Sequence, residues 1–187
     1  MALLGPHLPI LLWRRRYDEG RHEGDPFGLL APPSRLKEDP VSRVGTYLNF
    51  MGHTDEAFAF YAETFGTKPV TPITPITRMG DMTPGPGMPQ LTEEELGLVM
   101  HIELPILAGH VLMGTDMLES MGHELRIGNN TTIHLEPDTR DEADALYAAL
   151  SEGGSDTTGM QDMPWGAYWG CCLDRFGIRW MLNVPNE

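Results

Sequence analysis

The chain has 187 residues, of which 41% are hydrophobic and 21% are charged, a balance that is typical of an ordinary globular protein. The formal net charge of −14 argues against nucleic-acid binding, because phosphate contacts need clustered Lys and Arg, which occur here only in the first 43 residues. The two cysteines, Cys171 and Cys172, are adjacent, so a disulfide scaffold is excluded and a reducing cytoplasm is expected.

Residues 1–43 differ in character from the rest of the chain. Their opening apolar run is broken by two prolines and followed by arginines, the reverse of a secretory signal, and it is too short to span a membrane. The continuation is rich in Gly, Pro and charge, which is typical of a disordered extension. We expect no membrane association. The alternative is that the segment LLWRRR acts as a weak surface anchor. Two origins stay open for the segment, a functional extension or an upstream start codon.

A first βαβββ pattern occupies residues 44–117. A β-like run ends at Phe50, and a helix from Thr54 or Asp55 follows, with Gly66 as its stop signal. Its apolar stripe consists of Phe58, Tyr61, Ala62 and Phe65. The prolines in 67–82 predict an edge strand. A long loop over 83–97 and two strands, 98–106 and 110–117, complete the pattern.

A second βαβββ pattern occupies residues 129–185. It comprises a strand over 129–137, a helix opened by the capping box TRDE at 139–142, and strands over 157–163, 165–174 and 178–184. The octapeptides DEAFAFYA and DEADALYA begin the two helices 86 residues apart and are identical at six of their eight positions. Their equal placement indicates one unit used twice.

From about residue 44 to 185 the chain resembles the vicinal oxygen chelate superfamily of glyoxalase I, bleomycin-resistance proteins and extradiol dioxygenases. The segments YLNF, RMGDM, LVMHIELPI, LMGTDM and GAYWG resemble its PhnB-like branch, often labelled a 3-demethylubiquinone methyltransferase domain. The resemblance implies an α+β fold in which two βαβββ modules form a curled mixed sheet around a shared cavity. Methyltransferase activity is not expected, because the chain lacks a Gly-rich turn between a strand and a helix.

The resemblance also implies where a metal would bind. Metal-dependent members hold a divalent ion with one residue, usually His, on each module's first strand and one, usually Glu, on each last strand. Here the matching positions are Thr46, Met113, Thr132 and Met181. Hydroxyls are weak ligands and thioethers prefer Cu(I), so we expect no metal at this position and no cofactor. A register shifted by one residue would present Tyr47 and Asn49, and Asn49 would not restore the site.

Two histidines and one tryptophan complete the candidate cavity. His101 and His134 lie on predicted strands and are candidate hydrogen-bonding or acid–base groups, the alternative for each being a buried histidine that a neighbour satisfies. Trp165 is a candidate at the cavity mouth, whereas Trp180 is expected in the core. The predicted lining is therefore Thr46, His101, Met113, Thr132, His134, Trp165 and Met181. His53 and His110 are expected to face solvent.

These observations predict a metal-free protein that binds a small molecule of unknown identity, in the cytoplasm and as a homodimer. The alternative is an enzyme of the superfamily, an isomerase, lyase or dioxygenase, with a non-standard site.

Overall fold

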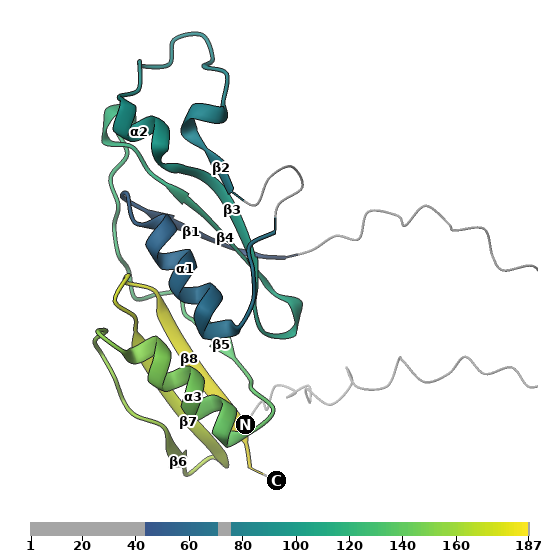
Figure 1. The fold of residues 1–187 in the computed structure, drawn as a ribbon. Helices are drawn as coiled ribbons and strands as arrows, with labels where there is room; N and C mark the ends of the chain where they lie inside the picture. Colours follow the sequence, from purple (N-terminus) through teal and green to yellow (C-terminus); the bar gives the residue numbers. More distant parts are fainter. Residues whose placement is uncertain (1–43, 71–75, 187) are drawn as a thin grey trace, which may run out of the picture. The chain divides into compact units, whose positions relative to one another are not determined.

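The computed structural model describes residues 44–70 and 76–186 (Figure 1). The predictions for the N-terminal extension lie outside these residues. Within the described part of the chain, no helix is both long and apolar enough to cross a membrane. The described residues form two βαβββ modules, each with its own four-stranded mixed sheet, which confirms the predicted α+β fold.

The first module builds a sheet in the order β1-β4-β3-β2, in which only the β1–β4 pair is parallel. Its strands are β1 (Thr46–Phe50), β2 (Ile76–Arg78), β3 (Val99–Pro105) and β4 (Val111–Asp116), and its helices are α1 (Thr54–Phe65) and the short α2 (Glu93–Gly97). The edge position of β2 agrees with the prolines around it. The predicted loop over 83–97 instead ends in α2, because Thr92 and Glu95 form a capping box.

The second module repeats this topology in the order β5-β8-β7-β6. Its elements are β5 (Ile133–Leu135), α3 (Arg140–Ser151), β6 (Gln161–Met163), β7 (Ala167–Leu173) and β8 (Arg179–Pro185). The predicted strands 129–137 and 157–163 are too long. Before β6, Ser155 and Thr158 still bond to the backbone of β7, but these contacts do not form a regular ladder.

The two long helices, α1 and α3, begin with side-chain contacts that the sequence predicted only in part. In α1 the free amide of Thr54 is bound by Asp116 at the end of β4, which accepts bonds from the Thr54 nitrogen and hydroxyl at 3.1 and 2.7 Å. In α3 Thr139 accepts from the Glu142 nitrogen, as the capping box predicts. The Glu142 carboxylate, however, accepts from the nitrogen of Asp138, one residue earlier than expected.

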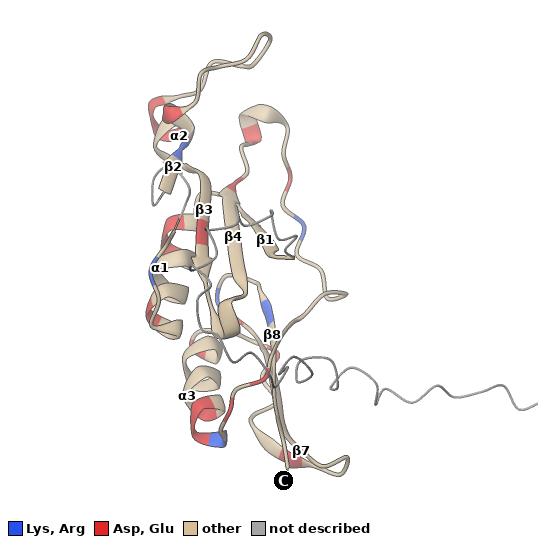
Figure 2. Cartoon of the chain, turned by 90° about the vertical axis from the view of Figure 1, so that its right-hand side faces the viewer, with Lys and Arg blue, Asp and Glu red and all other residues tan. Residues whose placement is uncertain are grey.

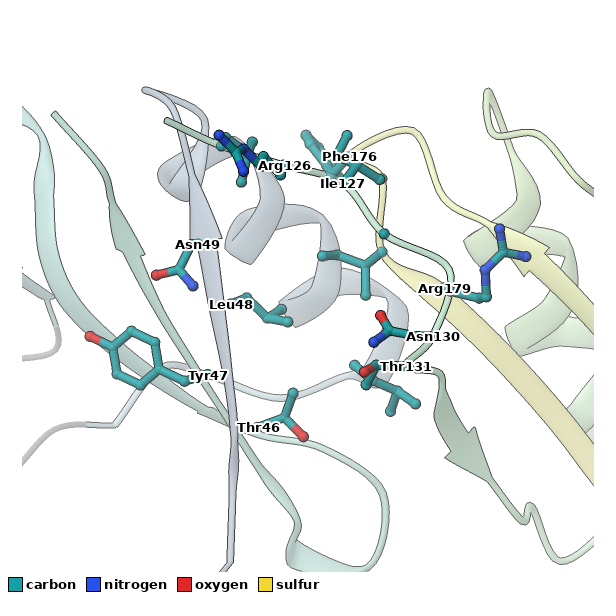
Figure 3. Close-up of a pocket in the computed structure, with 15 residues that line it drawn as sticks. Thr46, Tyr47, Leu48, Asn49, Arg126, Ile127, Asn130, Thr131, Phe176 and Arg179 are labelled. Atoms are coloured by element: carbon teal, nitrogen blue, oxygen red, sulfur yellow. The ribbon is translucent and has the colours of Figure 1, made fainter. Parts of the chain in front are cut away.

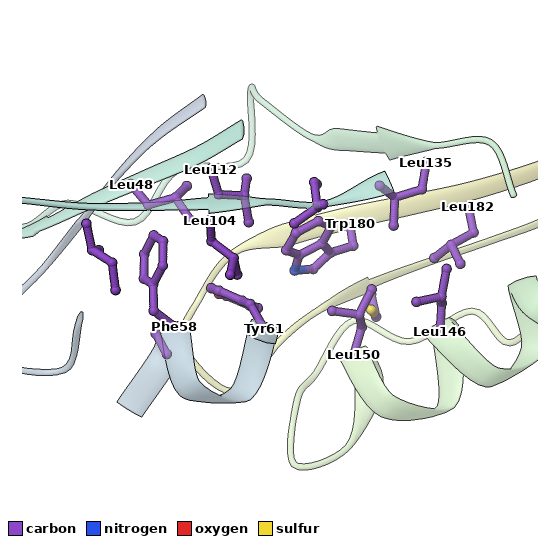
Figure 4. Packing of buried hydrophobic residues seen from close by; sticks show 14 of the residues in the cluster. Leu48, Phe58, Tyr61, Leu104, Leu112, Leu135, Leu146, Leu150, Trp180 and Leu182 are labelled. Carbon is purple, nitrogen blue, oxygen red and sulfur yellow. The ribbon is translucent and has the colours of Figure 1, made fainter. Parts of the chain in front are cut away.

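The two modules share one hydrophobic core between their helices and sheets (Figure 4). Trp180 is fully buried, as predicted, and packs against Tyr61 of the first module with the ring centroids 5.6 Å apart. The Tyr61 hydroxyl and the Trp180 indole each donate to the same carboxylate oxygen of Asp174 at 2.8 Å. The other oxygen accepts from the backbone nitrogens of Phe176 and Ile178, both at 2.9 Å.

Asp174 therefore ties the turn between β7 and β8 to α1. Burial raises the pKa of Tyr61 well above its usual value, and the negative charge of Asp174 raises it further. The phenol thus stays protonated and donates to the carboxylate.

Replacing Asp174 by alanine is expected to lower the free energy of unfolding by about 3 kcal/mol, because buried donors lose their acceptor. Tyr61→Phe should cost less, about 1 to 2 kcal/mol, since it removes one donor and leaves three. Urea unfolding measures both values. Glu124→Ala, at an exposed residue, serves as the control, and equal stability of the Asp174 and Glu124 variants would contradict this account of the carboxylate.

Candidate functional site

Each sheet carries its long helix on one face, and the other face presents polar and methionine side chains. In β1, Leu48 and Phe50 are buried, whereas Tyr47 and Asn49 are exposed. Figure 3 shows Tyr47 and Asn49 on one side of β1 and Thr46 and Leu48 on the other. The register shifted by one residue, which presents Tyr47 and Asn49 on the helix-free face, is therefore the correct one for this strand. Thr46 is hydrogen-bonded to His110, with its hydroxyl oxygen 2.9 Å from Nε2.

The first strands of the two modules are related by an odd residue spacing, although the helices are related by 86. The buried positions are Leu48 in β1 but Leu135 in β5, and one parity change moves every side chain to the opposite face. Across the sheets, Tyr47 lies opposite Met113, and His134 lies opposite Met181. The first-strand residues beside the two methionines are therefore Tyr47 and His134, rather than Thr46 and Thr132.

This arrangement does not fit the divalent metal of metal-dependent relatives. The set Tyr47, Met113, His134 and Met181 offers one imidazole and no carboxylate, and hard or borderline divalent ions need more nitrogen or oxygen ligands. Among the described residues, no group of three or more His, Cys, Asp and Glu side chains is placed to hold a metal ion.

A cavity of about 520 Å³ lies beside the helix-free face of the first sheet. Half of the chain's 12 methionines line it. We call it the methionine cavity; its sulfur-bearing residues are Met79, Met82, Met88, Met100, Met117 and Met121. Polar groups reach it from Tyr47, Asn49, Thr115 and His123.

A β-bulge in β3 supplies one wall of the methionine cavity. Thr77 pairs with His101 and Arg78 pairs with Val99, so Met100 is an extra residue without a partner in β2. Bulges re-aim side chains in this way. The remaining wall comes from residues 79–91 and from the segment after β4. The sequence predictions had divided the first of these segments between an edge strand over 67–82 and a loop over 83–97. A gathering of methionines in the two segments was the available signal.

At the edge of the methionine cavity three side chains form a chain of hydrogen bonds. The Tyr47 hydroxyl lies 3.2 Å from Nδ1 of His101, and Nε2 of His101 lies 3.3 Å from a carboxylate oxygen of Glu103. The rings of Tyr47 and His101 stack with centroids 5.8 Å apart. Burial raises the pKa of the Tyr47 phenol, and a hydrogen bond with Thr115 opposes this shift. The protonated phenol donates to the imidazole.

The seven residues predicted to line one cavity are spread over several places. Thr46, Thr132 and His134 line a separate pocket of about 470 Å³ together with His110. His110 was expected to face solvent, but it is half-buried. His101 and Met113 lie on the first sheet, and Met181 lies on the second. Their shared role in ligand binding stays a prediction.

Trp165 is 63% exposed and contacts Trp169 edge to face, with the centroids 6.3 Å apart. It therefore lies at the surface of the second module, and its predicted place at a cavity mouth stays a prediction. His53 is exposed, as expected. His123 accepts a bond from the Leu118 nitrogen at 3.1 Å and lines the methionine cavity.

A third pocket, of about 330 Å³, lies between the modules (Figure 3). Its walls come from β1, from the connection between the modules, and from the turn before β8. Arg126, Asn130 and Arg179 make it more polar than the methionine cavity. Arg179 is already paired with Asp156 at 2.9 Å.

Two βαβββ modules, each with a helix-free sheet face, are the fold of a known superfamily, and comparison of the sequence with family profiles leads to the same superfamily. The profile of the Glyoxalase/Bleomycin resistance protein/Dioxygenase superfamily matches residues 43–182, and the chain belongs to this superfamily. No curated protein matches it significantly.

Solved structures with the same fold include two of bacterial proteins. The protein PA1353 from Pseudomonas aeruginosa is 27% identical, and the match covers 79% of this chain and 100% of that one with a TM-score of 0.64. A PhnB protein from Bacillus cereus, described as a putative 3-demethylubiquinone-9 3-methyltransferase, is 23% identical, and the match covers 76% and 99% of the chains with a TM-score of 0.58. The latter supports the fold alone.

The two adjacent cysteines are expected to react very differently. Burial raises the pKa of the Cys172 thiol to about 11, whereas Cys171 is half-buried on the helix-free face. At about pH 8, iodoacetamide should therefore label one thiol per folded chain, because the thiolate is the nucleophile. Mass spectrometry should place the label on Cys171. Labelling that persists in Cys171→Ser and disappears in Cys172→Ala would reverse this assignment.

Proposed function

We propose that this chain is a small-molecule-binding protein whose methionine cavity holds a mostly apolar ligand without a divalent metal ion. The observation that carries the proposal is the concentration of six methionines around one cavity of about 520 Å³. Thioether side chains are flexible and polarisable, so they adapt to ligands of different shape. A cavity of this size and apolar character is typical of sites for small organic molecules.

The polar groups of the methionine cavity narrow the class of ligand. Asn49 and Thr115 offer an amide and a hydroxyl on neighbouring strands, and Tyr47 adds a phenol. Asp116 also lines the cavity, but its carboxylate already accepts bonds from Thr54 and Val99. A ligand with an apolar body and one end that accepts and donates hydrogen bonds would match these groups.

The charge of the chain favours a neutral or cationic ligand over an anionic one. The formal net charge is −14, and Figure 2 shows acidic residues, coloured red, on α1, α2 and α3. Long-range repulsion would lower the local concentration of an anion. Membership of a superfamily whose name includes bleomycin resistance proteins supports a binding role. We further propose that the protein acts in the cytoplasm as a homodimer.

Binding is tested with the fluorescent probe 1-N-phenylnaphthylamine, an apolar molecule with one amine. We expect a saturable increase in fluorescence, and a roughly tenfold weaker Kd in Met100→Gln and Met117→Gln, because each buries an amide without a partner. Met163→Gln, in the second module, is the matched control and should bind as the wild type does. Native mass spectrometry of the protein as purified reports any retained ligand, metal and oligomeric state.

Probe binding that is unaffected by the two cavity substitutions would reject the methionine cavity as the site. A stoichiometric divalent metal in the purified protein would reject the metal-free form of the proposal.

The chain Tyr47–His101–Glu103 favours a second candidate, a metal-free enzyme that moves a proton to or from a ligand in the methionine cavity. Glu103 is only 8% exposed and its carboxylate orients the imidazole, and the imidazole accepts the Tyr47 proton at Nδ1. The phenolate oxygen that results would take a proton from an acidic C–H or O–H of a bound molecule. Such positioned acid–base groups contribute about 10² to 10⁴ in rate.

Deuterium exchange into 1-phenyl-1,3-butanedione, an apolar molecule with an acidic CH₂ group, tests this candidate. The wild type should accelerate exchange, and Tyr47→Phe and Glu103→Gln should each lower the rate at least about tenfold. Tyr168→Phe, which alters a half-buried tyrosine of the second module, should exchange at the wild-type rate. Equal rates in wild type and Tyr47→Phe would remove the enzyme candidate and leave the binding proposal standing.

A further inference from the structure

Three potential metal ligands lie in one row across the second sheet. Met181 of β8 is opposite His134 of the parallel neighbour β5 and opposite Cys171 of the antiparallel neighbour β7. The strand order β5-β8-β7 places these residues on three consecutive strands (Figure 1). Met181 is therefore the middle residue of the row.

All three side chains point to the face of the sheet opposite α3. In β8 the neighbours Trp180 and Leu182 are buried, so Met181 faces the other way. In β7 Cys172 is fully buried, which places Cys171 on the same face as Met181. His134 is exposed, while Met181 and Cys171 are half-buried, so an ion has access to the row from solvent.

The spacing of the strands allows the three donor atoms to meet. Directly opposite residues on adjacent strands have Cβ atoms about 4.5 to 5.5 Å apart. The imidazole of His134 and the thiol of Cys171 therefore flank the Met181 thioether at one strand's distance on either side. An ion above Met181 would need metal–sulfur and metal–nitrogen bonds of roughly 2.0 to 2.3 Å. These bonds and the lengths of the side chains together bridge the distance from the ion to the strands on either side.

The backbone of Cys171 is held in place without the use of its side chain. Its nitrogen donates to the Thr158 hydroxyl at 2.9 Å, and its carbonyl accepts from the Tyr147 hydroxyl at 3.4 Å. The thiol belongs to no disulfide. A ligand on a fixed strand gives a metal site a defined geometry.

We infer that His134, Met181 and Cys171 form a binding site for a monovalent copper ion, Cu(I). Thiolate and thioether ligands select Cu(I), and imidazole also suits copper, whereas three ligands without a carboxylate do not suit Mg²⁺, Mn²⁺ or Ca²⁺. Binding releases the Cys171 proton, because the thiolate is the ligand. This site differs in metal from the divalent position of the superfamily. It shares His134 and Met181 with that position, but its third ligand, Cys171, comes from the neighbouring strand β7, and no residue of the first module takes part. It does not depend on the function proposed for the methionine cavity.

The test uses the full-length, reduced protein under anaerobic conditions, with Cu(I) supplied as its coloured bicinchoninate complex. The wild type should withdraw one Cu(I) per chain, which native mass spectrometry counts. Cys171→Ser should abolish this transfer. Met181→Leu and His134→Gln should each weaken the affinity about tenfold or more, as expected for the loss of one of three ligands. Cys172→Ala, which alters the buried neighbour, should bind as the wild type does.

Two results would overturn the inference. One is no transfer of Cu(I) to the wild type. The other is wild-type affinity in both Met181→Leu and His134→Gln together with loss in Cys171→Ser, which would show adventitious binding by a single thiol. Circular dichroism and binding of 1-N-phenylnaphthylamine in the same variants show that they are folded and that the methionine cavity is unaffected. Failure of the copper site is thus separable from failure of the proposed function.

Discussion

The joining of the two modules depends on the carboxylate of Asp174. It accepts two hydrogen bonds from its own turn and one each from Tyr61 and Trp180, which belong to different modules. A buried carboxylate is costly unless it is fully hydrogen-bonded, and here four donors meet that condition. Because both long helices and the shared core lie on this side of the sheets, the opposite faces are left to present functional side chains.

Those two faces differ in chemistry although they arise from one repeated unit. The first is bordered by the methionine cavity and carries the Tyr47–His101–Glu103 chain. The second carries a row of imidazole, thioether and thiol. In both, methionine occupies the last-strand position beside the first strand. Duplication thus preserved the scaffold, and the side chains on the two faces diverged independently.

Much of the fold follows from local patterns in the sequence, because helices and strands are set by periodicity and by stop signals such as Gly66. The burial of Trp180 also follows from strand alternation. The residues of the candidate site are predicted less well from the sequence. The spacing of 86, measured in the helices, does not hold in the first strands, so it carried Thr46 to Thr132, whereas the equivalent residues beside the two methionines are Tyr47 and His134. The contact of Tyr47 with His101 crosses an intervening strand, β4, which no local pattern reveals.

The odd spacing between β1 and β5 has a consequence for how this family changes. Adding or deleting one residue in the turn between a first strand and its helix leaves the helix in place and turns the whole strand over, because side chains alternate with a period of two. Such a change exchanges several pocket residues at once for their former core neighbours. Length variation in a short turn is therefore a route to new binding chemistry that requires no substitution within the strand itself.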